Sequence, residues 1–384
     1  MIDKILRGAV TARVWQAEWG TMDLTALLDD LRLLVDTESP SNDIAALTRS
    51  AAVLADLVER RLGSRPDIVP GPAGPHVHWK GGPSPRVLIV GHHDTVFPAG
   101  TVAARPFTVT DGRATGPGVF DMKGGIVQAL HAVAALDDRS GVEILITSDE
   151  EVGSATSRAL IEERAAACGK VLVFEPSADG GALKTGRKGV GTFEVIVHGK
   201  ASHAGLEPEK GINSLVAAAE LISVIATFGA PELGTTVTPT VAHAGTADNV
   251  VPAQTRFLVD VRVTEPAEQE RLEAAMASLA TSVPGATIEV RGGLNRPPMH
   301  PSASAELFPV AERVAARDGL SPVQGVAVGG GSDGNFTAAL GIPTLDGMGA
   351  VGGGAHADHE YVLVDTIADR VRLTAGLLAE LTAR

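Results

Sequence analysis

Residues 87–95 read Val87-Leu88-Ile89-Val90-Gly91-His92-His93-Asp94-Thr95, an apolar run that leads directly into a histidine and an aspartate. A short apolar run of this kind predicts a buried strand. In an open α/β sheet, ligands collect at the carboxyl ends of the strands. We therefore expect His92 to be a metal ligand at the end of this strand, with Asp94 as its supporting acid.

Two later predicted strands also end in acidic residues. Val142–Thr147 runs into Asp149-Glu150-Glu151, and Val171–Phe174 runs into Glu175. Three consecutive acids repel one another unless they are solvated or neutralised by cations, and the acidic run alone fits a solvated loop. The recurrence of ligand-type residues after three strands favours a shared site instead.

Two glycine-rich segments add further candidates. Gly116–Gly125 predicts a tight turn that opens a helix through Ala135, and such a turn by itself only indicates a helix cap. It contains Asp121, however, and a second glycine-rich segment, Gly347–Gly354, leads to His356. Both side chains are of the types that bind metals.

The candidates of the site are imidazoles and carboxylates: His92, Asp94, Asp121, Glu150, Glu151, Glu175 and His356. Such a set without thiolate suits zinc or a similar transition metal in a hydrolytic site. The single cysteine, Cys168, excludes an intramolecular disulfide and a thiolate cluster, and we expect it to be a small buried residue.

Charge and hydropathy exclude several classes of protein. The formal net charge of −14 argues against nucleic acid as a partner. Met1–Gly20 contains five charged residues and therefore lacks the apolar core of a signal peptide. Since no stretch approaches roughly 18 uninterrupted apolar residues, we expect no membrane span and a cytoplasmic protein.

The chain of 384 residues is long enough for two domains. Between residues 189 and 296 the pattern changes to strand, helix, strand, strand, helix, strand, a ferredoxin-like α+β series. We expect residues 189–296 to be an inserted domain and residues 1–188 and 297–384 to form one α/β domain. Gly292–Pro298 reads as the return linker, Ala303–Arg317 as a helix and Gln324–Val328 as a strand, and a closing helix is expected from Asp365 onward.

The ordered motifs resemble those of the dizinc metallopeptidase family that contains glutamate carboxypeptidase, aminoacylase, acetylornithine deacetylase and succinyl-diaminopimelate desuccinylase. They are Gly91-His92-His93-Asp94-Thr95, Gly116-Pro117-Gly118 with Asp121-Met122-Lys123-Gly124-Gly125, Asp149-Glu150-Glu151-Val152-Gly153-Ser154, Phe174-Glu175-Pro176, Lys200-Ala201-Ser202-His203-Ala204-Gly205 and Gly354-Ala355-His356. The resemblance extends from about Asp23 to the C-terminus. It implies a mixed-sheet dizinc catalytic domain with an inserted lid and dimerisation domain.

For the metals, the resemblance implies two Zn²⁺ per subunit, with Co²⁺ or Mn²⁺ as possible substitutes. One ion is bound by His92, Asp121 and Glu175, and the other by Asp121, Glu151 and His356, so Asp121 bridges the two. Glu150 is implied to be the general base, and Asp94 to orient His92. The peptide bond Asp121–Met122 is implied to be cis.

For the substrate, the resemblance implies residues of the inserted domain. His203 reaches the active site of a partner subunit and stabilises the oxyanion, although a surface histidine is the simpler interpretation of the residue alone. Asn249 and Arg262 bind the terminal carboxylate, where Arg262 would otherwise be an exposed strand residue. The backbone of Gly330 and Gly331 adds donors to the same carboxylate.

The sequence thus predicts a zinc-dependent hydrolase. The expected partners are a small peptide or N-acyl amino acid as substrate and a second copy of the chain. Asn295-Arg296-Pro297-Pro298 and the segment before His356 resemble glutamate carboxypeptidases most, which implies release of a C-terminal amino acid such as glutamate. An N-acyl amino acid deacylase is the alternative with the same chemistry. A non-catalytic binding protein on the same scaffold is the alternative of another class, and the retention of Glu150 speaks against it.

Overall fold

A six-stranded mixed sheet brings the predicted strand ends together. The computed structural model describes residues 23–383, and its central sheet has the strand order β1-β2-β6-β3-β7-β14. The strands span Asp67–Val69 (β1), His76–Lys80 (β2), Val87–His92 (β3), Val142–Thr147 (β6), Val171–Val173 (β7) and Thr344–Leu345 (β14). β3 is parallel to both β6 and β7, so these three strands end at the same edge of the sheet.

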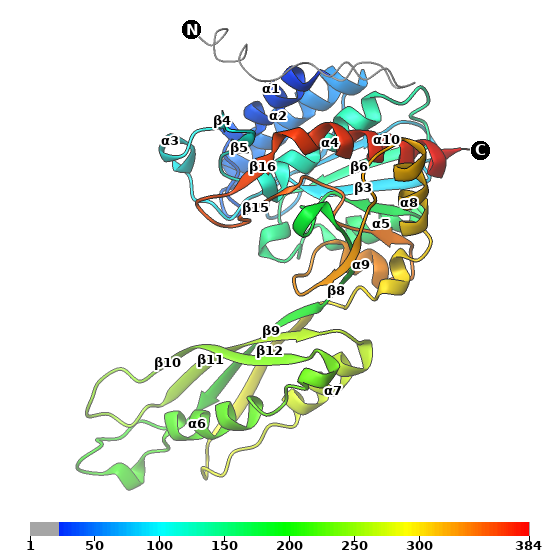
Figure 1. Cartoon of the computed structure of the whole chain (residues 1–384). Coiled ribbons are helices and arrows are strands. Elements are labelled where there is room, and N and C mark those ends of the chain that lie inside the picture. The colour runs from blue at the N-terminus through cyan, green and yellow to red at the C-terminus, as the bar shows by residue number, and fades with distance from the viewer. Residues whose placement is uncertain (1–22, 384) are drawn as a thin grey trace.

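Helices cover both faces of this sheet (Figure 1). One face packs on α1 (Leu24–Asp36), α2 (Ile44–Leu62), α4 (Gly124–Ala134) and α10 (Ile367–Thr382), with α8 (Phe308–Arg317) beside α10. The other face packs on α5 (Arg158–Cys168) and α9 (Gly334–Ala339). Because both faces are covered, β3 and β6 are apolar along almost their whole length.

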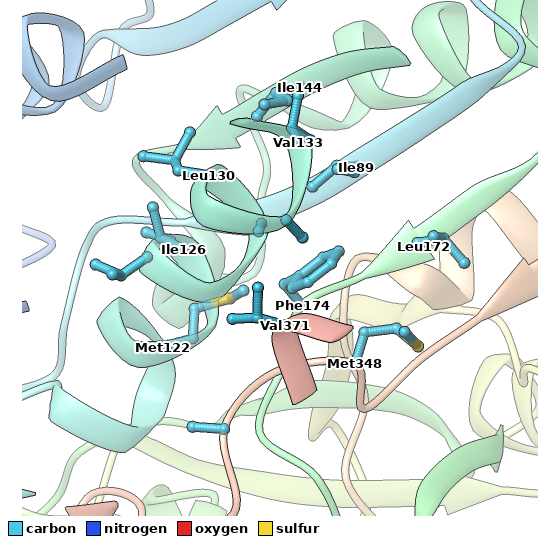
Figure 2. Close-up of a cluster of buried hydrophobic side chains, with 14 of the residues drawn as sticks. Ile89, Met122, Ile126, Leu130, Val133, Ile144, Leu172, Phe174, Met348 and Val371 are labelled. Carbon is cyan, nitrogen blue, oxygen red and sulfur yellow. The ribbon is translucent and has the colours of Figure 1, made fainter. Parts of the chain in front are cut away.

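The core on the α4 side packs directly beneath the candidate site. Figure 2 shows Ile89 and Ile144 from the sheet, Val133 and Leu130 from α4, and Met122 from the turn before that helix. All five side chains are at least 98% buried. The turn that carries Asp121 is thus anchored in the core by its next residue.

The first two helices begin and end at local signals in the sequence. The carboxylate of Asp23 accepts a hydrogen bond from the amide of Ala26, and the carboxylate of Asp43 does the same for Ala46. Gly63 ends α2 in the left-handed conformation, with φ of 81°. Met1–Gly20, which we expect not to be a signal peptide, lies outside the described residues.

Residues 189–296 contain the predicted ferredoxin-like series of elements. They are β9 (Gly189–His198), α6 (Ser214–Ile225), β10 (Thr236–Ala244), β11 (Gln254–Val263), α7 (Pro266–Ala277) and β12 (Thr287–Arg296). The strands pair antiparallel in the order β10-β11-β9-β12 and have a hydrophobic cluster of their own. This part extends away from the mixed sheet in Figure 1. Its role as a lid or dimerisation domain stays a prediction.

The strands that enter and leave this part are neighbours. β9 and β12 are hydrogen-bonded to each other along their length. Where they reach the larger body, the side-chain amide Nδ2 of Asn335 donates to the carbonyl of Lys188 at 3.0 Å and to that of Pro297 at 2.7 Å. Both connections are therefore held at one place.

Two predicted boundaries are wrong. Gly292–Pro298 is not a free linker, since β12 continues to Arg296 by means of Gly292, at φ of 81°, and a register shift between Leu294 and Arg296. The expected helix Ala303–Arg317 is divided into a helical turn, Pro301–Ser304, and α8. Pro309 favours a new start there because the first turn of a helix needs no N–H from it.

Small sheets complete the body around the site. The predicted strand near Gln324–Val328 is present as β13 (Gly325–Val328), which pairs parallel with β8 (Leu183–Arg187). Another small sheet has the strand order β15 (Gly352–Gly353), β16 (Tyr361–Leu363), β5 (Arg113–Thr115) and β4 (Thr108–Thr110). Its strands β15 and β16 flank the loop that carries His356. α3 (Thr101–Ala104) lies before β4. From residue 23 to 383, every helix is too short or too polar to cross a bilayer.

Candidate metal centre

The three strand ends bring the predicted ligands of distant segments together. β3 lies between β6 and β7, so His92 at its end is flanked by the turn after β6 and by Glu175 after β7. The turn after β6 carries Glu150 and Glu151. This arrangement is the one that the parallel strands predict.

Asp121 lies between the two histidines. Its Oδ1 is 3.3 Å from Nε2 of His92, and its Oδ2 is 3.4 Å from Nε2 of His356. Nε2 of His92 is also 3.5 Å from Oε1 of Glu175, and Nε2 of His356 is 3.0 Å from Oε2 of Glu151. The two carboxylate oxygens of Asp121 thus face two separate groups of donors, which is the arrangement that a bridging ligand requires.

Several atoms of this cluster are buried without a hydrogen-bond partner. They are Nε2 of His92, Oδ1 of Asp121 and Oε1 of Glu151. Buried polar atoms are normally paired, so an unpaired set at one point needs an explanation. Because imidazole and carboxylate are the donors of hydrolytic zinc sites, these residues fit divalent cations.

The electrostatics of the cluster also favour positive charge. Burial lowers the pKa of His92, but hydrogen bonds with Asp121, Asp94 and Glu175 raise it by more. The pKa of His92 therefore lies well above its usual value. Contacts with Asp121 and Glu151 raise the pKa of His356 to about 10. Burial raises the pKa of Asp121, but the two histidines outweigh it and hold that pKa far below its ordinary value. In the absence of metal, protons supply the charge that the carboxylates attract.

Glu150 lies beside the ligands with its side chain 12% exposed, and it has a different environment. One of its carboxylate oxygens lies within 4.8 Å of ligand atoms of His92 and Glu175. Burial raises the pKa of Glu150 well above its usual value, although the charge of Arg296, whose Nη2 is 2.9 Å from Oε1, opposes this. A buried carboxyl group with a raised pKa suits a general base.

Asp94 supports both the histidine and the acidic turn. Nδ1 of His92 is 3.0 Å from the backbone carbonyl oxygen of Asp94 and 3.4 Å from its carboxylate Oδ1. A proton on Nδ1 leaves Nε2 free to bind a metal. The carboxylate also accepts hydrogen bonds from the amides of Glu150 and Glu151 at 3.2 Å and from Oγ of Ser41 at 2.8 Å. Sequence reasoning assigned the orienting role but missed the contacts with the turn.

Glu360 is a residue of the site that sequence reasoning missed. Its carboxylate is 1% exposed and accepts hydrogen bonds from the amides of Gly118, Phe120 and Asp121 at 2.8–2.9 Å. It therefore holds the turn that presents Asp121, where the peptide bond Asp121–Met122 is cis as expected. No local sequence pattern marks Glu360, because its partners lie about 240 positions away in the sequence.

Two arginines were also missed as residues of the site. Arg187, from the end of β8, is buried and binds Asp346, and its Nη2 lies 3.4 Å from Oε2 of Glu175. Arg296, from the end of β12, contacts Glu150. No local sequence pattern distinguishes Arg187 from an arginine on a solvated surface, whereas the segment Asn295–Pro298 was the available signal for Arg296.

A cavity of about 720 Å³ adjoins the metal centre. Its walls include Glu150 and Glu151 on the acidic turn, Arg262 on β11, Arg296 and Gly331. Gly330 instead lines a second cavity of about 450 Å³ together with Lys184 and Arg187. The structure thus places three of the predicted substrate residues beside cavities at the site.

His203 and Asn249 are not brought to the metal centre of their own subunit. His203 is exposed and follows the far end of β9, and the amide of Ala204 donates to the carbonyl of Asn249. At about 3.3 Å per residue, β9 carries this region roughly 30 Å from the hinge at Gly189. The assignment of both residues to a substrate contact stays a prediction.

Comparison with known proteins extends over most of the chain. The model of peptidase family M20/M25/M40 matches residues 88–380. Carboxypeptidase G2 of Pseudomonas sp. (strain RS-16) is 34% identical over 318 residues, which cover 79% of this chain and 76% of that protein. Succinyl-diaminopimelate desuccinylase of Rhodospirillum centenum (strain ATCC 51521 / SW) is 31% identical over 321 residues, covering 77% and 80%. Aminopeptidase PepT of Bacillus cereus ATCC 10987 shares the fold, with a TM-score of 0.74, 21% identity and coverage of 94% and 100%.

Proposed function

The chain belongs to peptidase family M20/M25/M40 and is a metallohydrolase. We propose that it hydrolyses an amide bond beside a free carboxylate. The proposed reaction is that of a carboxypeptidase, which releases a C-terminal amino acid such as glutamate. The observation that carries the proposal is the position of Asp121 between His92 and His356, with the carboxylate of Glu150 beside them.

We assign one cation to His92, Asp121 and Glu175 and the other to Asp121, Glu151 and His356. The donor set favours Zn²⁺, and Co²⁺ and Mn²⁺ are possible substitutes. When bound, two such ions lower the pKa of a water molecule and polarise the scissile carbonyl. Asp94 keeps the proton of His92 on Nδ1, and Glu360 holds the backbone of Asp121 in place.

Glu150 moves the proton in this proposal. Its carboxylate accepts the proton of the attacking water as the C–O bond forms, and it then delivers this proton to the nitrogen of the leaving amine as the C–N bond breaks. Because the surroundings raise the pKa of Glu150, the group gains a proton readily. Because water is partly excluded around Glu150, its carboxylate also interacts more strongly with the charge that develops on the reacting amide.

The substrate's terminal carboxylate is assigned to Arg262, Asn249 and the backbone of Gly330 and Gly331. Arg262 lines the larger cavity and forms two hydrogen bonds with Asp260, at 2.9 and 2.8 Å. A bound carboxylate must share the guanidinium with Asp260 or displace it. A guanidinium that is already oriented gives up less conformational entropy on binding.

A second function has support of its own. Succinyl-diaminopimelate desuccinylase, a relative that is 31% identical, is named for an N-acyl bond. An N-acyl amino acid deacylase would use the same metals and base, and it would differ in which side of the amide bond carries the required carboxylate. Both alternatives leave the chemistry of Glu150 unchanged.

We also propose that the inserted part forms a homodimer and that His203 acts in the partner's site. Exposed apolar side chains support an interface there, since Leu215, Val216 and Val224 on α6 are 47–50% exposed and Leu206 is 76% exposed. His203 is too distant from its own metal centre. We further propose a cytoplasmic location.

The test is a panel of substrates with protein of known metal content. N-acetyl-L-alanyl-L-glutamate, N-acetyl-L-glutamate and N-acetyl-L-leucine are incubated with the wild type and with Glu150→Ala, each loaded with Zn²⁺, Mn²⁺ or Co²⁺. We expect Glu150→Ala to keep both metals and to lose kcat by about 100-fold or more. Absence of turnover in the wild type, or equal turnover in Glu150→Ala, would contradict the proposal.

A further inference from the structure

The end of β12 is tied to the turn that carries Glu150. Nδ2 of Asn295 donates to the carbonyl of Gly153 at 2.7 Å, and Nη1 of Arg158 donates to the carbonyl of Asn295 at 3.3 Å. Nη2 of Arg296 donates to the carbonyl of Glu150 at 3.2 Å. Since β12 belongs to the four-stranded sheet of the inserted part, these bonds join that sheet to the catalytic turn.

The guanidinium of Arg296 also binds side chains of two different segments. Nη2 lies 2.9 Å from Oε1 of Glu150 and 3.0 Å from Oγ of Ser154, while Nη1 lies 2.7 Å from Oδ1 of Asp333. The residue is 5% exposed, and its guanidinium lies 4.8 Å from the ring centre of Phe336. A planar fork is needed to reach both carboxylates, and a lysine ammonium does not have one.

The same arginine reaches the loop assigned to the substrate carboxylate. Asp333 follows Gly331 by two residues, and a Cβ added to Gly331 would lie 3.0 Å from Cδ of Arg296. A Cβ added to Gly153 would lie 2.8 Å from Nδ2 of Asn295. Close packing at both points leaves little freedom for Arg296 to move independently of its neighbours.

From these contacts we infer that Arg296 is the positioning residue of Glu150, and that Asn295 and Arg296 form a hinge latch that links the inserted sheet to the general base. This inference rests on the proposed role of Glu150. Arg296 holds one carboxylate oxygen of Glu150, so the carboxylate is oriented and its second oxygen is available to the water. A rotation of the inserted sheet displaces the backbone of β12 and hence the guanidinium.

The first experiment uses chemical rescue. In Arg296→Ala, kcat for N-acetyl-L-alanyl-L-glutamate should fall about 100-fold, with KM within about threefold and both metals retained, because orientation and not binding is lost. Arg296 lines the 720 Å³ cavity, so added guanidinium ion can enter its place and should raise kcat about tenfold, while an equal concentration of NaCl should not. In Arg296→Lys, which keeps the charge, kcat should fall while KM stays unchanged.

Arg164→Ala is the matched control. Arg164 also forms a fork with a buried carboxylate, that of Glu143, but it lies outside the site. The control should lose stability, retain kcat and show no response to guanidinium. Wild-type kcat in Arg296→Ala and Arg296→Lys, or a loss of kcat that guanidinium does not relieve in a folded variant with both metals, would overturn the inference.

A second readout does not depend on activity. Spin labels at Thr48→Cys on α2 and Ala274→Cys on α7 report the distance between the two sheets by pulsed electron resonance, with unlabelled protein added so that pairs within one chain dominate. Cys168 is buried and should not react. Asn295→Ala and Arg296→Ala should each broaden the distance distribution, and an unchanged distribution in both contradicts the latch. If the wild type shows no turnover, the proposed function fails, and the distances still decide whether the latch exists.

Discussion

His92 and His93 are adjacent residues with opposite surroundings. Successive side chains of a strand point to opposite faces, so His92 faces the metal centre while His93 contacts Oγ of Ser50 and the carbonyl of Pro75, each at 3.1 Å. Burial lowers the pKa of His93 to about 4, and its imidazole is neutral at pH 7. Of the two neighbours, only His92 lies beside the predicted metal ligands.

Glu360 gives a prediction at the same scale. In Glu360→Gln the side chain offers one acceptor oxygen and an NH₂ group to three backbone N–H donors, so the turn that presents Asp121 should loosen. We expect the affinity for Zn²⁺ to fall about 10–100-fold, as for other groups that orient ligands. The measurement is a titration against a competing chelator.

Asp358→Asn provides the control for Glu360. Its carboxylate is 93% exposed and lies 3.5 Å from Arg105, so the substitution should leave the Zn²⁺ affinity unchanged. Equal affinities of Glu360→Gln and the wild type would show that the three hydrogen bonds do not hold the ligand.

Residue-scale prediction had a clear limit. His92, Asp121, Glu151, Glu175 and His356 could be proposed because each lies in a motif beside a strand or glycine-rich turn. The site roles of Glu360 and Arg296 depend on contacts with residues more than 140 positions away in the sequence. No local pattern records such contacts, so only the folded structure reveals them.

At the scale of elements, a buried ion cluster ties β2 and α5 to β6. Glu143 on β6 is fully buried, and its carboxylate binds Nε2 of His78 at 2.6 Å and Nη2 of Arg164 at 2.9 Å. Burial raises the pKa of Glu143, but His78 and Arg164 lower it to about 2. A carboxyl group with a pKa lowered by folding stabilises the protein above its unfolded pKa, and this contribution is lost as the pH falls toward 2.

Glu143→Gln should therefore reduce the free energy of unfolding by about 3 kcal/mol at pH 7, since it leaves the guanidinium of Arg164 without its carboxylate partner. The difference from the wild type should shrink as the pH falls from about 4.5 toward 3, because the wild-type carboxylate is protonated in the unfolded state. Urea unfolding of chelator-treated proteins measures both values. A constant difference over this range would exclude the coupling, and Glu163→Gln, at an exposed neighbour of Arg164, is the control.

The element boundaries show which sequence signals are sufficient. α1 and α2 each begin at a local cap, Asp23 or Asp43, and such caps can be read from neighbouring residues alone. The glycine and proline residues of Gly292–Pro298 predict a linker, since both residue types are typical of linkers. Pairing with β9 overrides that composition, and the positive φ of Gly292 is what allows the strand to continue.

For the whole molecule, the proposed dimer predicts complementation between two inactive variants. His203→Ala should retain both metals and lose most of kcat, and Glu150→Ala lacks the base. After subunit exchange, a mixed dimer has one site with an intact base and an intact His203 from the partner. An equimolar mixture should thus recover about a quarter of the wild-type activity, as expected for random association of twofold dimers.

The assay compares the mixture with each variant alone, and sedimentation gives the oligomeric state. A mixture no more active than its components, with dimers present, would refute a shared site. A fully active monomer would refute the role of His203 altogether.

Asn335 also has a consequence for protein engineering. The side-chain amide of Asn335 binds the carbonyls of Lys188 and Pro297, so the chain leaves and re-enters the catalytic domain at a single point. A module whose own termini lie side by side could replace residues 189–296 without altering the path of the surrounding chain, and a short turn could join the two connections directly. The two carbonyls held by Asn335 also offer a fixed point for attaching a sensor or binding module next to a hydrolytic site.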